Sequence, residues 1–368
     1  MIKRYAASYI QNLKFTLDEI DLNQFEKIVS VLLKAREADK QIFIVGNGGS
    51  ASTASHFACD LGRGTVNFSN DGFDRFRAIS LTDNMALVTA IGNDISYDSI
   101  FTEQLKNLMN KGDVLIGITA SGNSPNILKS FEYAKKVGAV TIGFLGFGGG
   151  KASQIVDYNL TVSSNNYGIS EDFHLIIGHI LTQIIRRILN EKKQKVMFLD
   201  RDGVINENPA EHSYITRWEE FKFIQDIFDT LTALQAKGYR FVVVTNQQGI
   251  AKNIFSEADL FTIHENMLDV FRKKNISIDN IYYCPHLETD HCPCRKPNPG
   301  LFYRAQNELP FIIDFENSFV IGDSEKDILA GKEFGIKTIY YANSKGQQLS
   351  SIQPDYTIKR LLDVLDIA

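Results

Sequence analysis

Apolar residues in the first half of the chain recur with two different spacings. Helical spacing runs through residues 1–40 and returns at 51–61, 99–109, 126–136 and 173–189. Short continuous apolar runs, which predict strands, lie at 41–45, 76–81, 114–119 and 140–145. Because strands and helices alternate, this half predicts a parallel sheet covered by helices.

A charged segment separates this half from a second series of the same kind. The run NEKKQK at 190–195 has no apolar anchor, so we expect a linker at 191–195 between domains of residues 1–190 and 196–368. Further strands are predicted at 196–199, 241–245, 281–284 and 319–321. The predicted fold class is therefore α/β, with two doubly wound parallel-sheet domains.

Composition and charge narrow the classes of function. Of 368 residues, 44% are hydrophobic and 23% are charged, as in ordinary globular proteins. The net charge of −5 disfavours a general nucleic-acid binder, which usually has a basic surface. No apolar run reaches the roughly 20 residues that span a bilayer, and the basic N-terminal segment lacks the apolar stretch of a signal peptide. We expect a cytoplasmic protein without a membrane or nucleic-acid partner.

Two acids one residue apart follow the predicted strand at 196–199. Asp200 and Asp202, in the sequence DRDG, would lie at the carboxyl end of the sheet, where α/β proteins bind ligands. Carboxylates this close repel each other unless a cation lies between them, and Mg²⁺ prefers oxygen ligands. Asp200 could attack phosphorus to form an aspartyl-phosphate, and Asp202 could protonate the leaving alcohol and later activate water.

Further groups suited to phosphate chemistry follow in order along the chain. The candidates for binding the phosphoryl group are Thr245, Asn246 and Gln247 after one strand, and Arg295 and Lys296 in a later loop. Asp323 after another strand adds a carboxylate for the metal, and Asp327 lies one helical turn further on. Each motif alone is more often a solvated loop, but their order at strand ends predicts a magnesium-dependent phosphatase.

The second half resembles the haloacid dehalogenase-like phosphatases from residue 196 to about 345. The motifs DRDGVIN, VVVTNQQGIA, YYCPH, CPCRKPNPG and IGDSEKDILA are similar to those of the D,D-heptose bisphosphate and histidinol phosphatase group. The resemblance implies that Asp200 is the nucleophile and Asp202 the acid and base. It also implies that Thr245 and Lys296 bind phosphate, and that Asp200, Asp202 and Asp323 hold magnesium. Ser324 stands where heptose phosphatases have Lys.

Three cysteines and a histidine lie close together within this half. Cys284-x-His286 and Cys292-x-Cys294 would supply three sulfurs and one nitrogen, a suitable tetrahedral set for Zn²⁺. The alternative is that the cysteines are reduced and buried; His291 is also near, but the family pattern favours His286. A zinc site with four protein ligands is closed, so we expect it to be structural and to shape the loop that carries Arg295 and Lys296.

Two glycine- or serine-rich turns in the first half each lie between a strand and a helix. They are 46–50 (GNGGS) and 119–124 (TASGNS), where backbone N–H groups and hydroxyls could bind phosphate. His56 and Asp60 lie four residues apart on one helical face. Glu171 and His179 lie eight apart, about 80° from each other around a helix, so they could join the same site. His174 and His179 could instead be packed in an apolar helix.

Residues 5–190 resemble the sugar isomerase domain family, specifically the sedoheptulose 7-phosphate isomerases. The resemblance lies in GNGGSAS, HFA, IGND, TASGNSPN and HIL, in that order. It implies an enediol mechanism, with Asp60 and His179 catalytic and zinc held by His56, Asp60, Glu171 and His179. The implied substrate-binding residues are Asn47, Gly48, Gly49, Asn93, Asp94, Thr119, Ala120, Ser121, Ser124 and Glu171. The family has Glu at the position of Asp60 and Gln at that of Glu171.

The pairing of the two halves predicts a bifunctional enzyme with phosphorylated heptose substrates. The resemblances correspond to an isomerisation and a dephosphorylation that a separate heptose 7-phosphate kinase would connect. A histidinol phosphatase fused to a sugar isomerase domain stays an alternative, as does a non-catalytic phosphosugar-binding first domain. The resemblance also implies a homotetramer formed through the first domain, with Mg²⁺ and Zn²⁺ as cofactors.

Overall fold

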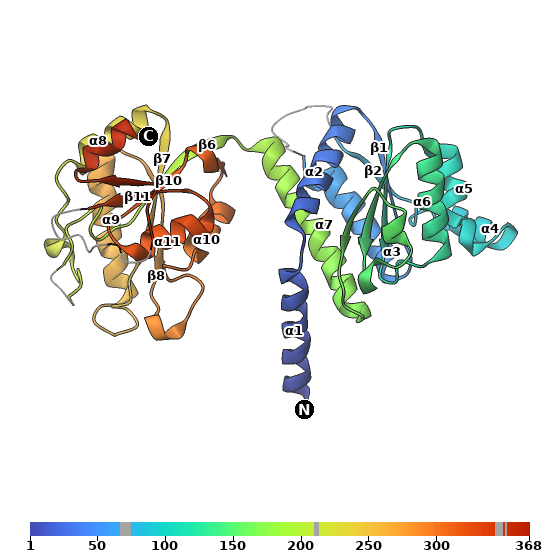
Figure 1. Ribbon diagram of the computed structural model, residues 1–368, viewed down its shortest axis with the longest axis horizontal. Helices are drawn as coiled ribbons and strands as arrows, with labels where there is room; N and C mark the ends of the chain where they lie inside the picture. Colours follow the sequence, from blue (N-terminus) through green and yellow to red (C-terminus); the bar gives the residue numbers. More distant parts are fainter. Residues whose placement is uncertain (67–74, 210–212, 343–348, 350–351) are drawn as a thin grey trace. The chain divides into compact units, whose positions relative to one another are not determined.

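The chain folds into two compact units, Met1–Asn190 and Glu191–Ala368, in the computed structural model shown in Figure 1. The structure describes residues 1–66, 75–209, 213–342, 349 and 352–368. Both units are α/β, and every paired strand in each main sheet runs parallel to its neighbour, so the predicted fold class is confirmed.

The first unit is built around a sheet of five parallel strands in the order β2-β1-β3-β4-β5. The strands are β1 (Gln41–Gly46), β2 (Arg77–Ser80), β3 (Val114–Thr119), β4 (Val140–Leu145) and β5 (Tyr158–Thr161). This is the flavodoxin-like order, in which the connections reverse direction between β1 and β3. Ligands of such sheets bind at the carboxyl ends of the strands beside this reversal.

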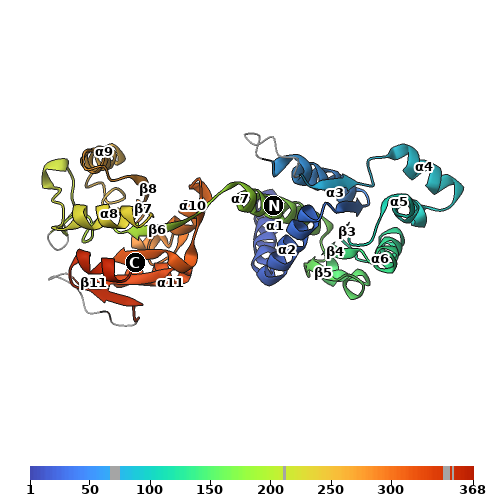
Figure 2. The same cartoon turned by 90° about the horizontal axis from the view of Figure 1, so that it is seen from above.

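Helices cover both faces of the first sheet (Figure 2). One face packs against α2 (Leu22–Glu37), α3 (Gly49–Cys59) and α7 (Tyr167–Asn190). The other packs against α5 (Ile100–Leu108) and α6 (Pro125–Val137). The helix α1 (Ile2–Asp18) contacts α7, and most of its residues are exposed. The strands β1, β3 and β4 are almost wholly buried because side chains on both faces lie under helices.

Two elements of the first unit were not predicted from the apolar pattern. The helix α4 (Met85–Asp94) contains many apolar residues and yet buries none of them within the described part of the chain. The strand β5 has only four residues, and one of them is buried. Both lack the contrast between a buried and an exposed face from which periodicity predicts an element.

The second unit has a longer parallel sheet in the order β12-β11-β10-β6-β7-β8. The strands are β6 (Lys193–Leu199), β7 (Tyr239–Asn246), β8 (Ile278–Cys284), β10 (Phe319–Gly322), β11 (Lys337–Tyr341) and β12 (Tyr356–Ile358), and β9 (Ile312–Ile313) pairs with the start of β6. One face packs against α8 (Ile227–Ala236) and α9 (Glu257–Lys273), and the other against α10 (Gly300–Glu308) and α11 (Glu325–Phe334).

The segment predicted as a linker is shorter in the structure. Helix α7 continues to Asn190, and β6 begins at Lys193, so residues 193–195 are strand residues. Their backbone pairs with β9, where Lys193 lies opposite Ile312 and Gln194 opposite Ile313. Charged side chains at the start of a strand can point to water while the backbone is paired. The charged composition of this segment therefore predicted a linker where the structure has a strand. None of the described helices is both long and apolar enough to cross a membrane.

Candidate active sites

Asp200 lies at the carboxyl end of β6, in the middle of the second sheet. Its backbone N–H donates a hydrogen bond to the carbonyl of Ile321 at 3.0 Å, which joins it to β10. The turn that follows requires glycine at position 203, where φ is 89°. A side chain at Gly203 would lie 2.0 Å from the Asp323 carboxylate, so this glycine lets the acids of two strands approach each other.

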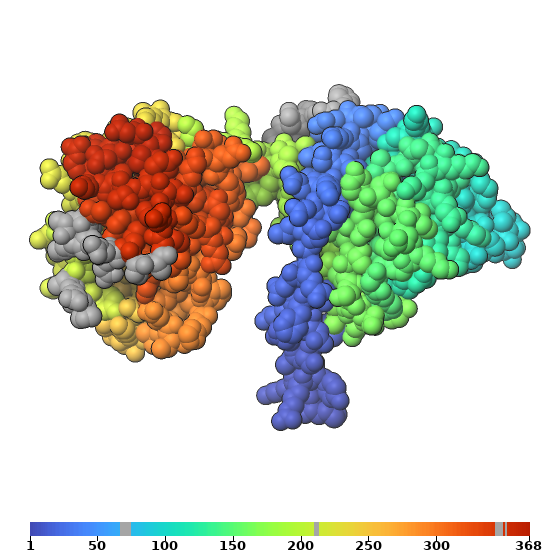
Figure 3. All heavy atoms as spheres, in the orientation of Figure 1, coloured from blue at the N-terminus to red at the C-terminus, as the bar shows by residue number. Residues whose placement is uncertain are grey.

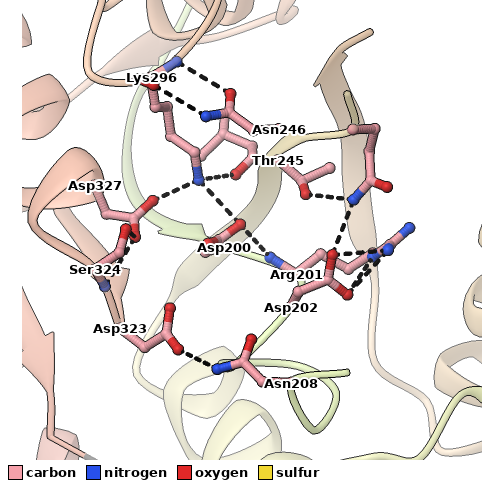
Figure 4. A network of polar contacts seen from close by, with 12 residues as sticks. Asp200, Arg201, Asp202, Asn208, Thr245, Asn246, Lys296, Asp323, Ser324 and Asp327 are labelled. Atoms are coloured by element: carbon pink, nitrogen blue, oxygen red, sulfur yellow. Dashed lines mark hydrogen bonds and ion pairs between the residues drawn. The ribbon is translucent and has the colours of Figure 1, made fainter. Parts of the chain in front are cut away.

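Lys296 is buried beside Asp200 (Figure 4). Its Nζ lies 2.9 Å from Oδ1 of Asp200 and 2.5 Å from Oδ1 of Asp327, and it donates to the carbonyl of Val244 at 2.8 Å. Asp327 is fully buried and also accepts a hydrogen bond from the hydroxyl of Ser324. A phosphoryl group that reaches Asp200 would therefore meet a fixed cation.

The pKa values of Asp200 and Lys296 are both raised, for different reasons. Burial raises the pKa of Asp200 well above its usual range, and the charge of Asp327 adds to the shift although Lys296 opposes it. Burial alone would lower the pKa of Lys296, but the charges of Asp200 and Asp327 outweigh it and raise this pKa. Lys296 is thus protonated, and a further cation would favour the ionised form of the acids.

Three acids lie where such a cation could bind. One carboxylate oxygen from each of Asp200, Asp323 and Asp327 lies within 4.8 Å of the others. Oxygen donors and a net negative charge fit Mg²⁺, which when bound would neutralise and orient the phosphoryl oxygens. Asn208 donates a hydrogen bond to Oδ2 of Asp323 at 2.5 Å and holds that carboxylate in place. Two of the three predicted magnesium ligands are therefore brought together.

The carboxylate of Asp202, the third predicted ligand, does not belong to this cluster. It accepts hydrogen bonds from the Arg201 guanidinium at 2.8–3.1 Å, from Asn206 at 2.9 Å and from Gln247 at 3.0 Å. Burial would raise the pKa of Asp202, but Arg201 and the hydrogen bonds outweigh it and lower this pKa. Adjacent residues at a strand end can point in different directions, which the spacing in DRDG does not reveal.

The predicted phosphate-binding residues take several positions around Lys296. Thr245 and Gln247 are buried, and Gln247 donates to the Thr245 hydroxyl at 2.9 Å. Asn246 holds the backbone of Lys296 through two hydrogen bonds of 3.0 Å, one to its carbonyl and one from its N–H. Arg295 donates to Gln248 at 3.2 Å and to the His286 carbonyl at 3.4 Å, so its guanidinium faces the cysteine loop.

The four predicted zinc ligands converge in that loop. The three sulfurs lie 3.3–3.6 Å from one another, and the His286 Nδ1 lies 3.5 Å from the Cys284 sulfur and 3.2 Å from the Cys294 sulfur. A tetrahedral zinc with Zn–S bonds of about 2.3 Å would place its ligands roughly 3.7 Å apart, and a disulfide would need about 2.05 Å. The donor set therefore fits Zn²⁺, and His291 is not part of the cluster.

A second metal-like cluster lies in the first unit. His56 on α3 and His179 on α7 place their Nε2 atoms 2.9 Å apart, and Asp60 Oδ2 lies 3.4 Å from His56 and 3.8 Å from His179. Asp60 begins a single π-helical turn at Asp60–Gly64, an irregularity often found at functional sites. All three side chains are partly exposed, so the cluster is open to a ligand.

Glu171 lies apart from these three residues. Eight residues of α-helix rise about 12 Å, an axial distance that the angular argument for Glu171 and His179 leaves out. Glu171 instead lines a cavity of about 130 Å³ with Asn47, Thr119, Ala120, Ser121 and Ser124, as predicted for the substrate site. A side chain at Gly49 would lie 2.6 Å from Glu171 Oε1, so glycine there admits the carboxylate.

The remaining predicted substrate residues have other surroundings. Asn47 exchanges two hydrogen bonds with Asn126, of 2.8 and 2.9 Å, and ties the turn after β1 to the start of α6. Gly48 precedes α3 with a φ of 55° and lines a neighbouring cavity of about 500 Å³. Asn93 and Asp94 are exposed at the end of α4, where Asn93 donates to Asp94 at 2.8 Å, and neither lines the cavity that contains Glu171.

Several residues of the second site have roles that the sequence analysis did not predict. Asn206 and Asn208 hold acids in place, and Ser324 caps α11 while it binds Asp327. Asparagine and serine are common in loops, so their role depends on which acid the fold brings near them. Arg201 is fully buried, although arginine in a loop usually faces water.

The second unit has the arrangement of a phosphoryl-transfer enzyme that works through a carboxylate, and the first has a flavodoxin-like fold with an open acid and histidine cluster. A family model described as SIS domain matches residues 4–146, and one described as HAD-hydrolase-like matches residues 293–364. The chain belongs to both families, with phosphoheptose isomerase relatives of its first unit and heptose bisphosphate phosphatase relatives of its second.

Curated relatives match the two units separately. D-glycero-alpha-D-manno-heptose-1,7-bisphosphate 7-phosphatase of Campylobacter jejuni is 38% identical over 171 residues, 46% of this chain and 95% of the relative. Phosphoheptose isomerase of Clostridium acetobutylicum is 39% identical over 174 residues, 47% of this chain and 86% of the relative. D-glycero-beta-D-manno-heptose-1,7-bisphosphate 7-phosphatase of Vibrio cholerae is 41% identical over 150 residues, 39% of this chain and 77% of the relative.

Proposed function

We propose that the chain is a bifunctional enzyme of heptose biosynthesis. Its first unit would convert sedoheptulose 7-phosphate to D-glycero-D-manno-heptose 7-phosphate. Its second would remove the C7 phosphate of D-glycero-D-manno-heptose 1,7-bisphosphate. The observation that carries the phosphatase half is the buried Lys296 between Asp200 and Asp327 at the end of β6.

In the phosphatase reaction Asp200 attacks phosphorus and the sugar oxygen leaves. Lys296, 2.9 Å from Asp200, neutralises charge on the transferring group, and the Thr245 hydroxyl offers a further hydrogen bond. Asp202, which its lowered pKa keeps ionised in the free protein, would take up a proton when the phosphorylated substrate binds and give it to the leaving oxygen. It would then take a proton from the water that hydrolyses the aspartyl-phosphate. Magnesium would be held by Asp200 and Asp323, with Asp327 nearby.

The test of the phosphatase is the substrate comparison on the purified full chain. We expect higher kcat/KM for heptose 1,7-bisphosphate than for histidinol phosphate, and Asp200→Asn should lower phosphatase turnover by at least about 10⁴-fold while isomerase turnover is kept. Both anomers of the bisphosphate should be assayed, because the relatives include an alpha and a beta enzyme. Preference for histidinol phosphate would overturn the heptose assignment.

In the isomerase reaction a base removes a proton beside the carbonyl to form an enediol. His56, Asp60 and His179 supply acid and base groups within 3.8 Å of one another, and their donor set fits Zn²⁺, which would polarise the carbonyl. The phosphate of the substrate would bind at the start of α6, where Thr119, Ser121 and Ser124 line the cavity. Glu171 in the same cavity would contact the sugar hydroxyls.

The isomerase assignment is tested by incubating the protein with sedoheptulose 7-phosphate, with and without added zinc. Asp60 is one methylene shorter than the Glu of the family, and a shift of about 1 Å can cost roughly a hundredfold in rate. Asp60→Asn should abolish turnover and leave phosphatase activity unchanged. An unchanged substrate under both metal conditions would instead support a first unit that binds phosphosugars without catalysis.

A homotetramer through the first unit is part of this proposal. Helix α1 leaves Ile2, Tyr5, Ile10 and Phe15 between 55% and 81% exposed, and Figure 3 shows much of α1 standing out from the body of its unit. A helix with several exposed apolar side chains is suited to packing against a second copy. Sedimentation of the full chain tests it, and Ile10→Glu should dissociate the assembly.

The two proposed reactions are separated by a phosphorylation at C1. We therefore include in the proposal a heptose 7-phosphate kinase on another chain, which takes the product of the first unit and supplies the substrate of the second.

A cytoplasmic location is also part of the proposal. It is consistent with the three free cysteines that are expected to bind metal, because thiols stay reduced in the cytoplasm.

A further inference from the structure

His264 lies behind the proposed acid of the phosphatase site, on an element that none of the predicted motifs includes. It lies on α9 and is 5% exposed, and its Nε2 is 3.3 Å from Nη1 of Arg201. Burial lowers the pKa of His264 to about 3, and the charge of Arg201 lowers it further. The ring is therefore neutral, and its Nε2 can accept a hydrogen bond from the guanidinium.

Arg201 uses the rest of its guanidinium on Asp202. Nε donates to Oδ1 at 3.1 Å, and Nη2 donates to Oδ1 at 2.9 Å and to Oδ2 at 2.8 Å. The guanidinium is planar, so fixing Nη1 at His264 also fixes the direction of the donors that face Asp202. Arg201 and Asp202 are neighbours in sequence. Hydrogen bonds between their two side chains do not by themselves fix the position of the pair relative to the rest of the site, whereas a contact with a separate helix does.

We propose that His264 is a positioning residue for phosphoryl transfer, which through Arg201 sets where the Asp202 carboxylate lies relative to the leaving oxygen. Asn206 and Gln247 hold the same carboxylate from the other sides, at 2.9 and 3.0 Å. Both oxygens of Asp202 therefore accept hydrogen bonds from protein side chains. Of these three donor residues, Arg201 is the one that contacts helix α9, through His264. The inference rests on the proposed role of Asp202 as the acid for the leaving group.

The leaving group provides a test that separates positioning from a structural role. An alkyl oxygen needs a proton as it leaves, whereas 4-nitrophenolate leaves without one. The kcat/KM value covers the steps only as far as phosphoryl transfer to Asp200, so later hydrolysis of the aspartyl-phosphate does not enter it. A misplaced acid should therefore lower kcat/KM for alkyl phosphates and leave that for 4-nitrophenyl phosphate nearly unchanged.

The experiment compares His264→Leu with His264→Gln in the full chain. With heptose 1,7-bisphosphate, His264→Leu should lower kcat/KM roughly 10- to 100-fold, and with 4-nitrophenyl phosphate less than about threefold. His264→Gln keeps an acceptor for Arg201 and should restore most of the loss. Glu265→Gln, on the exposed neighbour of His264 in α9, is the matched control and should leave both values unchanged.

The outcomes distinguish this inference from the proposed function. If wild-type protein turns over only histidinol phosphate, the heptose assignment fails, and that alkyl phosphate takes the place of the bisphosphate in the comparison. Equal losses on alkyl and aryl substrates, or a Gln variant as poor as Leu, would overturn the role of His264. Arg201→Lys is the second variant if His264→Leu is insoluble, because Lys keeps the charge but cannot bridge Asp202 and His264, and the same selective loss is expected.

Discussion

Buried polar side chains decide the chemistry of both units. Lys296 has two carboxylates and a carbonyl around its Nζ, and so it stays charged where burial alone would favour the neutral form. His174 on α7 is buried without such compensation, and burial lowers its pKa to about 4 although the Leu145 carbonyl opposes part of the shift. A neighbouring charge, more than burial, therefore determines which of these groups is ionised.

Removing the Lys296 charge should unfold as well as inactivate the second unit. Lys296→Met leaves two buried acids without their cation, so we expect the free energy of unfolding to fall by about 3–5 kcal/mol. The chain has one tryptophan, Trp218, whose fluorescence reports this unit during denaturation. The matched control is Lys326→Met, since Lys326 is 43% exposed and paired with Glu288, and it should cost about 1 kcal/mol or less. Similar losses for both variants would contradict this account.

His174 should make the first unit less stable in mild acid. The folded pKa is about 4 and the unfolded value is roughly 6.5, so the unfolded chain gains a proton first as the pH falls. Stability is then lost between about pH 6.5 and 4, by at most roughly 3 kcal/mol, and is fully present above this window. His174→Leu should reduce the difference between denaturation midpoints at pH 7.5 and 5, measured by circular dichroism. His291→Leu, an exposed histidine, should leave that difference unchanged.

Among the elements, the loops that follow parallel strands bring the reacting groups together. The turn after β6 presents Asp200 and Asp202, and the loop after β8 contains the cysteine cluster and ends in Arg295 and Lys296. The cluster is tied to that end by hydrogen bonds from Arg295 to the His286 carbonyl and from Asn298 to the Cys292 carbonyl. The loop is long and has little regular structure, so a metal is a suitable means of giving it one shape.

Loss of one of the four expected zinc ligands should weaken phosphatase catalysis without changing the reacting groups. Cys292→Ser should release zinc and lower phosphatase kcat/KM about 10- to 100-fold, because Lys296 would be held less firmly beside Asp200. Zinc content by atomic absorption and turnover on the same preparation give the comparison. Cys59→Ser, which changes an exposed cysteine of the first unit, should alter neither. Full phosphatase turnover in a Cys292→Ser protein that has lost the zinc of its second unit would show that the cluster has no part in placing Lys296.

At the scale of the whole molecule, each unit has its own hydrophobic cores. Phe173 belongs to a core formed by α2, α3, α7 and the first sheet, and Phe198 to one formed by α10, α11 and the second sheet. Both side chains are almost completely buried. A unit with its own sheet and its own cores can fold as one cooperative body, so the two activities should fail separately.

Core substitutions should separate the two activities. Phe173→Ala should cost the first unit about 3–5 kcal/mol and shift its transition in circular dichroism, while the Trp218 fluorescence transition stays where it was. Phe198→Ala should shift the Trp218 fluorescence transition of the second unit and leave the transition of the first unit where it was. After graded heating, this variant should lose phosphatase activity before isomerase activity. A single transition seen by both probes and moved by either variant would mean that the units unfold together.

The α/β class and the residues of the main motifs can be predicted from the amino-acid sequence alone. Strand runs such as 114–119 and 241–245 are buried on both faces, so their apolar pattern is unambiguous. The resemblances, confirmed by the relatives of each unit, indicated a phosphoheptose isomerase beside a heptose bisphosphate phosphatase. The carboxyl ends of the strands in a parallel sheet meet at one edge, where ligands bind. Polar residues that directly follow an apolar strand run are therefore recognisable as candidate site residues.

The direction of each side chain and the residues it contacts depend on how the chain folds in three dimensions. The tertiary structure turned Asp202 toward Arg201 and brought Asp327 beside Lys296. It also placed Glu171 in a cavity outside the cluster that contains His179, and placed β6 in the segment expected to be a linker. These features depend on contacts between residues far apart in the chain, and His264 behind Arg201 is the clearest case. Periodicity and spacing describe one element at a time, so they contain no information about such contacts.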